Sequence, residues 1–113
     1  MSDTEPAAHL SIPETFARLQ SRGQVPPLRR TSGCYEFDLE GGGHWFLTLD
    51  HGMPSVQANV DHPRCTVKCD GADFVDIVEG RRNMVTAYLR GDLDCSGDLA
   101  FALTFRHLVP PAA

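Results

Sequence analysis

The sequence predicts an α+β fold of two layers, in which a five-stranded, mostly antiparallel sheet has one face covered by short helices. Two observations lead to this prediction. Several segments alternate between apolar and polar residues, as strands with one buried and one wet face do. Other segments repeat apolar residues at the helical period. A chain of 113 residues has room for one such domain.

The clearest alternation runs over residues 34–40, where apolar side chains fall on one side and carboxylates on the other. The glycine run 41–43 joins it to a second alternating segment, 44–50, as a hairpin. A turn is expected at 51–54. Further strands are expected at 56–60, 64–70 and 93–95.

Helix signals lie before and after this group of strands. Ser11 is a candidate N-cap and Pro13 suits the first turn of a helix over 14–22. Asp70 is a candidate N-cap for the next helix. The later helices are expected at 71–79, 84–90 and 98–106, although the Leu-x-Phe alternation in the last segment also permits a strand.

Composition limits the function classes. We expect a loose leader at 1–11, a single domain at 12–109 and a tail at 110–113. The net charge of −5 argues against a nucleic-acid-binding protein, which needs a basic face. No apolar run approaches a membrane span, and the acidic start does not resemble a signal peptide, so we expect a cytoplasmic protein.

The four cysteines are expected to be reduced thiols in the core. Cys65 and Cys69 are four residues apart on one predicted strand, a separation of about 13 Å, whereas a disulfide needs Cα atoms within about 7 Å. Pairing with Cys34 or Cys95 stays open. We expect no metal, cofactor or catalytic residue, because no metal-ligand spacing, phosphate-binding loop or dinucleotide motif is present.

In two parts of the chain, the order of the residues resembles that of a known family of domains. The first is Gly-Cys-Tyr-Glu-Phe-Asp-Leu-Glu-Gly (33–41), followed by Trp45 and Gly-Met-Pro-Ser-Val (52–56). The second is the run 80–98, in which Gly, Asn, an Ala-aromatic pair, Gly, Leu and Gly-Asp recur. Together they resemble the sterol carrier protein type-two domains, over roughly residues 30–107.

This resemblance implies a five-stranded sheet backed by helices, with a tunnel between them that binds sterols, fatty acids, acyl-CoA or other lipids. It implies a non-catalytic carrier whose partners are an apolar ligand and an enzyme that receives it. A head group would contact Tyr88 or the Arg81–Arg82 pair, although solvated arginines in a loop explain that pair more simply. The candidate ligand-binding residues are Trp45, Leu47, Phe74, Ile77, Met84, Val85, Tyr88, Leu89, Phe101, Leu103 and Phe105.

Three alternatives remain open at this stage. The same apolar residues would fill a solid core, and the chain would then be a protein-interaction module. A cavity could also position a hydrophobic biosynthetic substrate for an enzyme or accessory role. For catalysis, His44 lies on the wet side of the predicted hairpin with Asp38 and Asp50, where it could form a His–carboxylate pair.

Tyr88→Ala tests the carrier hypothesis. Because Tyr88 falls on the apolar stripe of the helix over 84–90, we expect its removal to enlarge the cavity and alter ligand preference more than it harms folding. Ligand uptake and urea unfolding would be measured on the same preparation. Loss of all folding without any change in ligand range would argue against Tyr88 as a pocket residue.

Overall fold

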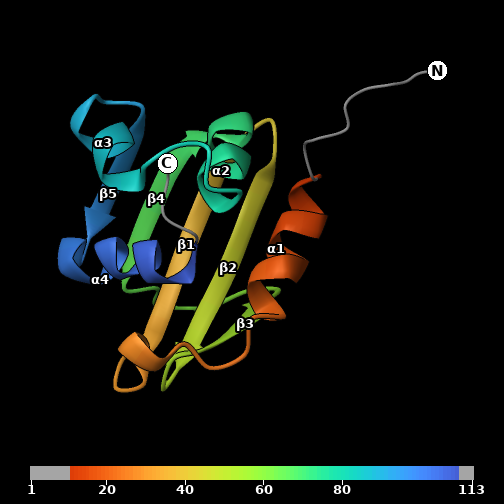
Figure 1. The fold of residues 1–113 in the computed structure, drawn as a ribbon, viewed down its shortest axis with the longest axis vertical. Coiled ribbons are helices and arrows are strands. Elements are labelled where there is room, and N and C mark those ends of the chain that lie inside the picture. Colours follow the sequence, from red (N-terminus) through yellow and green to blue (C-terminus); the bar gives the residue numbers. More distant parts are fainter. Residues whose placement is uncertain (1–10, 110–113) are drawn as a thin grey trace.

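The computed structural model describes residues 11–109 and contains one five-stranded sheet in the order β3-β2-β1-β4-β5 (Figure 1). β1 pairs in parallel with β4, and the other neighbours are antiparallel. The predicted mostly antiparallel sheet is therefore confirmed. The strands are β1 (Gly33–Glu40), β2 (Gly43–Asp50), β3 (Met53–Gln57), β4 (Cys65–Asp70) and β5 (Leu93–Gly97).

The helices gather on one face of the sheet, which confirms the two-layer arrangement (Figure 1). The last helical segment, expected at 98–106, is helical and not a strand, and its second half tightens into a 3₁₀ turn. The helices are α1 (Ile12–Gln20), α2 (Gly71–Val78), α3 (Met84–Leu89) and α4 (Leu99–Leu103), with 3₁₀ turns at Pro26–Leu28 and Thr104–Leu108.

Helix α1 begins as its sequence predicts. The Ser11 hydroxyl accepts a hydrogen bond from the Glu14 N–H at 3.2 Å, and the Ser11 N–H donates to the Glu14 carboxylate at 2.9 Å. This capping box satisfies two backbone donors at the helix start. Asp70 occupies the N-cap position of α2 but forms no side-chain cap there. Of the expected leader and tail, residues 1–10 and 110–113 lie outside the described part of the chain.

The expected position of the third strand is wrong. The turn uses only His51 and Gly52, both at positive φ, so β3 starts at Met53 and not at Val56. A two-residue turn of this kind matches the twist of a hairpin, and Pro54 is tolerated because β3 is an edge strand. Ala58 and Val60 consequently fall in the connection to β4.

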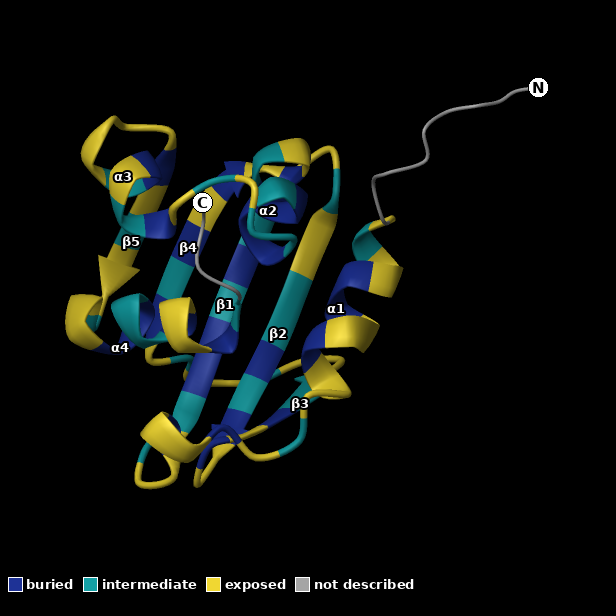
Figure 2. Ribbon diagram, in the orientation of Figure 1, coloured by how far each residue is buried: buried dark blue, intermediate teal, exposed yellow. Residues whose placement is uncertain are grey.

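The core lies between the sheet and the helices, where the inward residues of the central strands are almost fully buried (Figure 2). Tyr35 and Phe37 of β1 are both 0% exposed, and they lie opposite Leu47 and Trp45 of β2. On the other side of β1 they pair with Cys65 and Val67 of β4. The layer between sheet and helices is therefore built around β1.

Two glycines offer a matched test of this packing. Gly97 and Gly91 have nearly the same backbone angle, φ +87° and +85°. A Cβ at Gly97 would lie 2.7 Å from the Arg64 carbonyl oxygen, whereas one at Gly91 would meet no atom within 4 Å. We expect Gly91→Ala to cost about 1–2 kcal/mol of unfolding free energy, and Gly97→Ala about 1–3 kcal/mol more. Urea titrations would measure both, and equal losses would contradict the close approach of β5 to Arg64.

Candidate functional site

Aromatic rings fill the space between sheet and helices. Phe16 of α1 stacks on Trp45 of β2 with ring centroids 4.5 Å apart, and on Phe74 of α2 at 5.0 Å. Phe105 packs against both Phe37 and Phe74, at 5.1 and 5.9 Å. These contacts join α1, α2 and the 3₁₀ turn Thr104–Leu108 into one apolar layer.

Most of the predicted ligand-binding residues belong to this layer. Phe74, Phe101 and Phe105 lie in it together, as do three buried aliphatic residues: Leu47, Ile77 and Met84. Trp45 and Tyr88 are half-buried and pack against it, and Val85 and Leu103 are half-buried.

Leu89 does not reach the apolar layer in this structure, because its side chain is 76% exposed. It ends α3, a helix of six residues whose buried side chains are Met84 and Ala87. Five residues after Met84, Leu89 lies on the far side of the helix. The prediction that Leu89 faces the apolar layer is therefore wrong.

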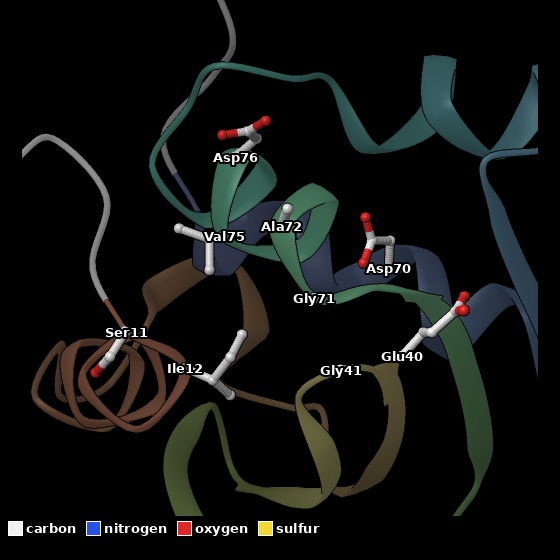
Figure 3. Close-up of a pocket in the computed structure, with 9 residues that line it drawn as sticks. All are labelled: Ser11, Ile12, Glu40, Gly41, Asp70, Gly71, Ala72, Val75 and Asp76. Atoms are coloured by element: carbon white, nitrogen blue, oxygen red, sulfur yellow. The ribbon is translucent and has the colours of Figure 1, made fainter. Parts of the chain in front are cut away.

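An open groove of about 560 Å³ lies where the start of α1, the β1–β2 turn and the start of α2 meet (Figure 3). Its centre is apolar and its edges carry carboxylates. None of the predicted ligand-binding residues lines it. The lining consists of Ser11, Ile12, Glu40, Gly41, Asp70, Gly71, Ala72, Val75 and Asp76.

Ile12 determines how closely these three elements approach. A Cβ at Gly42 would lie 3.2 Å from the Ile12 side chain, and one at Gly71 would lie 3.4 Å from it. The absence of side chains at the two glycines therefore makes room for Ile12. Because Ile12 is one helical turn before Phe16, and Val75 follows Phe74, the groove lies beside the stacked Phe16–Phe74 pair.

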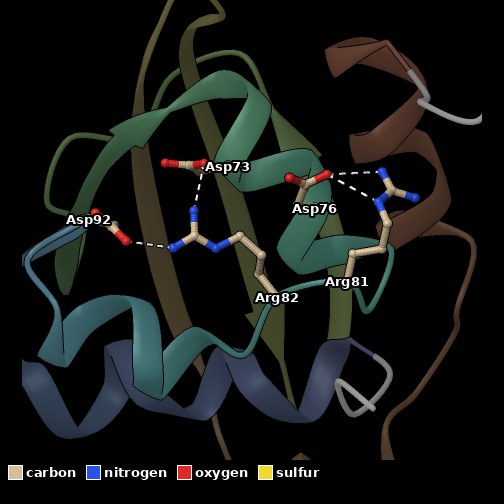
Figure 4. A network of polar contacts seen from close by, with 5 residues as sticks. All are labelled: Asp73, Asp76, Arg81, Arg82 and Asp92. Carbon is tan, nitrogen blue, oxygen red and sulfur yellow. Dashed lines mark hydrogen bonds and ion pairs between the residues drawn. The ribbon is translucent and has the colours of Figure 1, made fainter.

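Both arginines of the α2–α3 connection are held by carboxylates (Figure 4). Arg82 contacts Asp92 at 2.5 Å and Asp73 at 2.8 Å, so it ties α2 to the segment before β5. The hydrogen bond to Asp92, together with the charge of Asp73, raises the pKa of the Arg82 guanidinium. Arg81 is held by Asp76 at 3.0 Å and by Glu79.

A family comparison accounts for this architecture. A model of the SCP-2 sterol transfer family matches residues 14–110. The chain belongs to this family. That membership supports binding or transfer of a sterol or another lipid by the SCP-2 domain.

Individual relatives show the same domain in different settings. Hydroxysteroid dehydrogenase-like protein 2 of Xenopus tropicalis is 28% identical over 87% of this chain, but the chain spans only 24% of that protein. The sec-alkylsulfatase Pisa1 from Pseudomonas sp. contains a similar fold (TM-score 0.75, 20% identity), covering 92% of this chain and 17% of Pisa1. The palmitated SCP2L2 of Aedes aegypti is similar over 99% of its own length and 92% of this chain (TM-score 0.68, 19% identity).

The buried thiols and His44 are the remaining groups that could take part in acid–base or nucleophilic chemistry. Burial raises the pKa of Cys34 to about 11 and of Cys65 and Cys69 to about 12, which keeps these thiols protonated and poorly nucleophilic. His44 lies on the exposed face of the sheet, where its Nε2 is 3.2 Å from Glu36 and 3.9 Å from Asp38. The predicted pairing of His44 with Asp50 is wrong, because the Asp50 carboxylate contacts the adjacent His51.

The buried thiols should make the unfolding free energy of the SCP-2 domain depend on pH. Their pKa is raised above the ordinary value of 9.0, so their contribution is complete below about pH 9 and is lost as the pH rises towards about 12. The slope is up to about 1.4 kcal/mol per pH unit for each thiol. Urea titrations at about pH 8 and about pH 10.5 would measure it. The Cys65→Ala variant is expected to lose less unfolding free energy than the wild type between these two pH values. An equal loss in both proteins would contradict the buried thiols as the cause.

Proposed function

We propose that this SCP-2 domain is a non-catalytic carrier that holds the hydrocarbon part of a lipid between the sheet and the helices. The family membership supports this proposal most directly. The aromatic layer around Phe16, Phe37 and Phe74 provides an apolar surface of the required kind. In the described structure the rings fill this layer, so a ligand must displace some of them.

We further propose that the ligand enters through the groove between α1 and α2. The groove is open to solvent and has apolar walls at Ile12, Ala72 and Val75. Next to it, α1 and α2 meet through the stacked rings of Phe16 and Phe74. A small displacement of α1 would open this contact and connect the groove with the layer beneath.

The energy of burial is sufficient for such a rearrangement. A chain of about twelve methylenes contributes roughly 10 kcal/mol on leaving water, at about 0.8 kcal/mol for each. Separating a stacked aromatic pair costs about 0.5–1.5 kcal/mol beyond the area it re-exposes. Association itself costs about 4–15 kcal/mol. When this cost lies in the lower part of that range, hydrocarbon burial leaves a net gain without a specific polar anchor.

Delivery to an enzyme partner is part of the proposal. Relatives such as hydroxysteroid dehydrogenase-like protein 2 and Pisa1 are several times longer than this chain. Raised thiol pKa values and the exposed position of His44 argue against a catalytic centre formed by these groups. No helix among residues 11–109 is long and apolar enough to cross a membrane. The four free cysteines fit a reducing, cytoplasmic setting.

A matched pair of substitutions tests the entry route. Ala72 and Ala100 are both exposed and both lie in the first turn of a helix, but only Ala72 lines the α1–α2 groove. We expect Ala72→Trp to lower the affinity for a fluorescent lipid about tenfold, because the indole fills the groove. Ala100→Trp should leave it unchanged. Uptake would be followed by fluorescence titration and by native mass spectrometry of the purified chain.

The outcomes separate the competing functions. A chain that takes up no lipid and carries none on purification would favour the solid-core interaction module. Lipid binding that both variants weaken equally would contradict entry at Ala72 while leaving the carrier function in place.

A further inference from the structure

We propose that the α1–α2 groove makes this carrier selective for the charge of the ligand's polar end, favouring a cationic amine over an uncharged hydroxyl and disfavouring a carboxylate or phosphate. The inference rests on the proposed function, since it concerns the head group of a ligand whose hydrocarbon part lies in the apolar layer. It deepens that proposal by naming the class of ligand.

The charged residues that line the groove are all acidic. Glu40 and Asp70 lie together on one side of the apolar residues Ile12 and Val75, and Asp76 lies on α2 next to Val75 (Figure 3). Among the described residues 11–109, no Lys, Arg or His lines the groove. Glu40 and Asp70 are register partners at the ends of the parallel strands β1 and β4, so the parallel pairing brings their two charges to one edge of the groove.

Nearby arginines do not reverse this sign. Arg81 forms ion pairs with both Asp76 and Glu79. Arg82 is shared in the same way by Asp73 and Asp92. Among residues 11–109, no ion pair involves Glu40 or Asp70. Within this part of the chain, the charges of Glu40 and Asp70 therefore act on a ligand without a basic side chain bound to them.

A second groove extends the acidic field. It has a volume of about 540 Å³ and shares Glu40 and Asp70 with the first. Of the residues that the structure describes, its lining includes one basic side chain, Lys68, beside five carboxylates: Asp38, Glu40, Asp70, Asp73 and Asp92. A head group beside Glu40 and Asp70 would therefore be close to the carboxylates of both grooves.

The dipole of α2 acts in the opposite direction to the carboxylates. The amino end of α2 faces the groove at Gly71 and Ala72, and the dipole of a helix gives this end about half a positive charge. The groove edge carries two full charges at Glu40 and Asp70, besides the partly neutralised Asp76. The carboxylates outweigh the dipole, so the groove repels anions.

Three ligands with the same hydrocarbon chain test this inference: dodecylamine, dodecanol and dodecanoate. Each would displace the uncharged probe N-phenyl-1-naphthylamine from the purified chain near pH 7.5, in low salt. We expect dodecylamine to bind about tenfold or more tightly than dodecanoate, with dodecanol between them. Raising the ionic strength to about 0.5 M should bring the three affinities closer together.

A pair of double variants places the effect in the groove. Glu40→Gln combined with Asp70→Asn should strengthen dodecanoate binding and weaken dodecylamine binding, each about threefold or more, with dodecanol unchanged. Asp50→Asn combined with Asp61→Asn is the control, because it removes the same net charge and neither residue lines the groove. The control should keep the wild-type order.

Each result has a defined meaning. Equal affinities, or tighter binding of dodecanoate, would overturn the charge selectivity while the carrier function stands. Failure of the chain to bind the probe or any of the three ligands would instead contradict the proposed function itself. Identical changes in both double variants would show that total charge, and not the groove, sets the order, and would overturn the inference.

Discussion

The contact of Phe16 with Trp45 and Phe74 determines how the helical layer is attached to the sheet. A single residue of α1 stacks on both β2 and α2, so one turn of helix fixes the position of two elements. Each such ring pair adds about 0.5–1.5 kcal/mol to the burial of its area. The groove exists because this contact lies one turn inside α1, while the helix start at Ser11 and Ile12 remains beside the β1–β2 turn and α2.

Local patterns were sufficient to predict most of the fold. Alternation located four of the five strands closely, and the helical period with its caps located the helices. The position of the third strand is not predicted from the sequence because Pro54, a residue typical of turns, lies buried in an edge strand. The parallel pairing of β1 with β4 left no local signal, because β2 and β3 lie between these two strands in the sequence.

The site was less accessible to sequence reasoning. Apolar periodicity selects residues that face the core, and six of the eleven candidates are indeed buried there. The prediction for Leu89 failed because a six-residue helix has too few turns to define its buried face. The groove was missed because its walls come from the starts of two helices, a glycine turn and the ends of two strands, and these have no shared period. The nearest signal was the pair Gly42 and Gly71, where the absence of a side chain admits Ile12.

The central parallel pair also bears on the order of folding. β1 and β2 are joined by a short turn and can pair early, whereas Tyr35 must wait for Cys65, thirty residues later in the chain. Closing that long loop costs chain entropy before its contacts are formed, which slows folding in proteins dominated by distant pairings. Until β4 arrives, one edge of β1 exposes its backbone donors and acceptors together with Tyr35 and Phe37. A newly made chain is therefore most exposed to aggregation in the interval between the formation of the hairpin and the docking of β4.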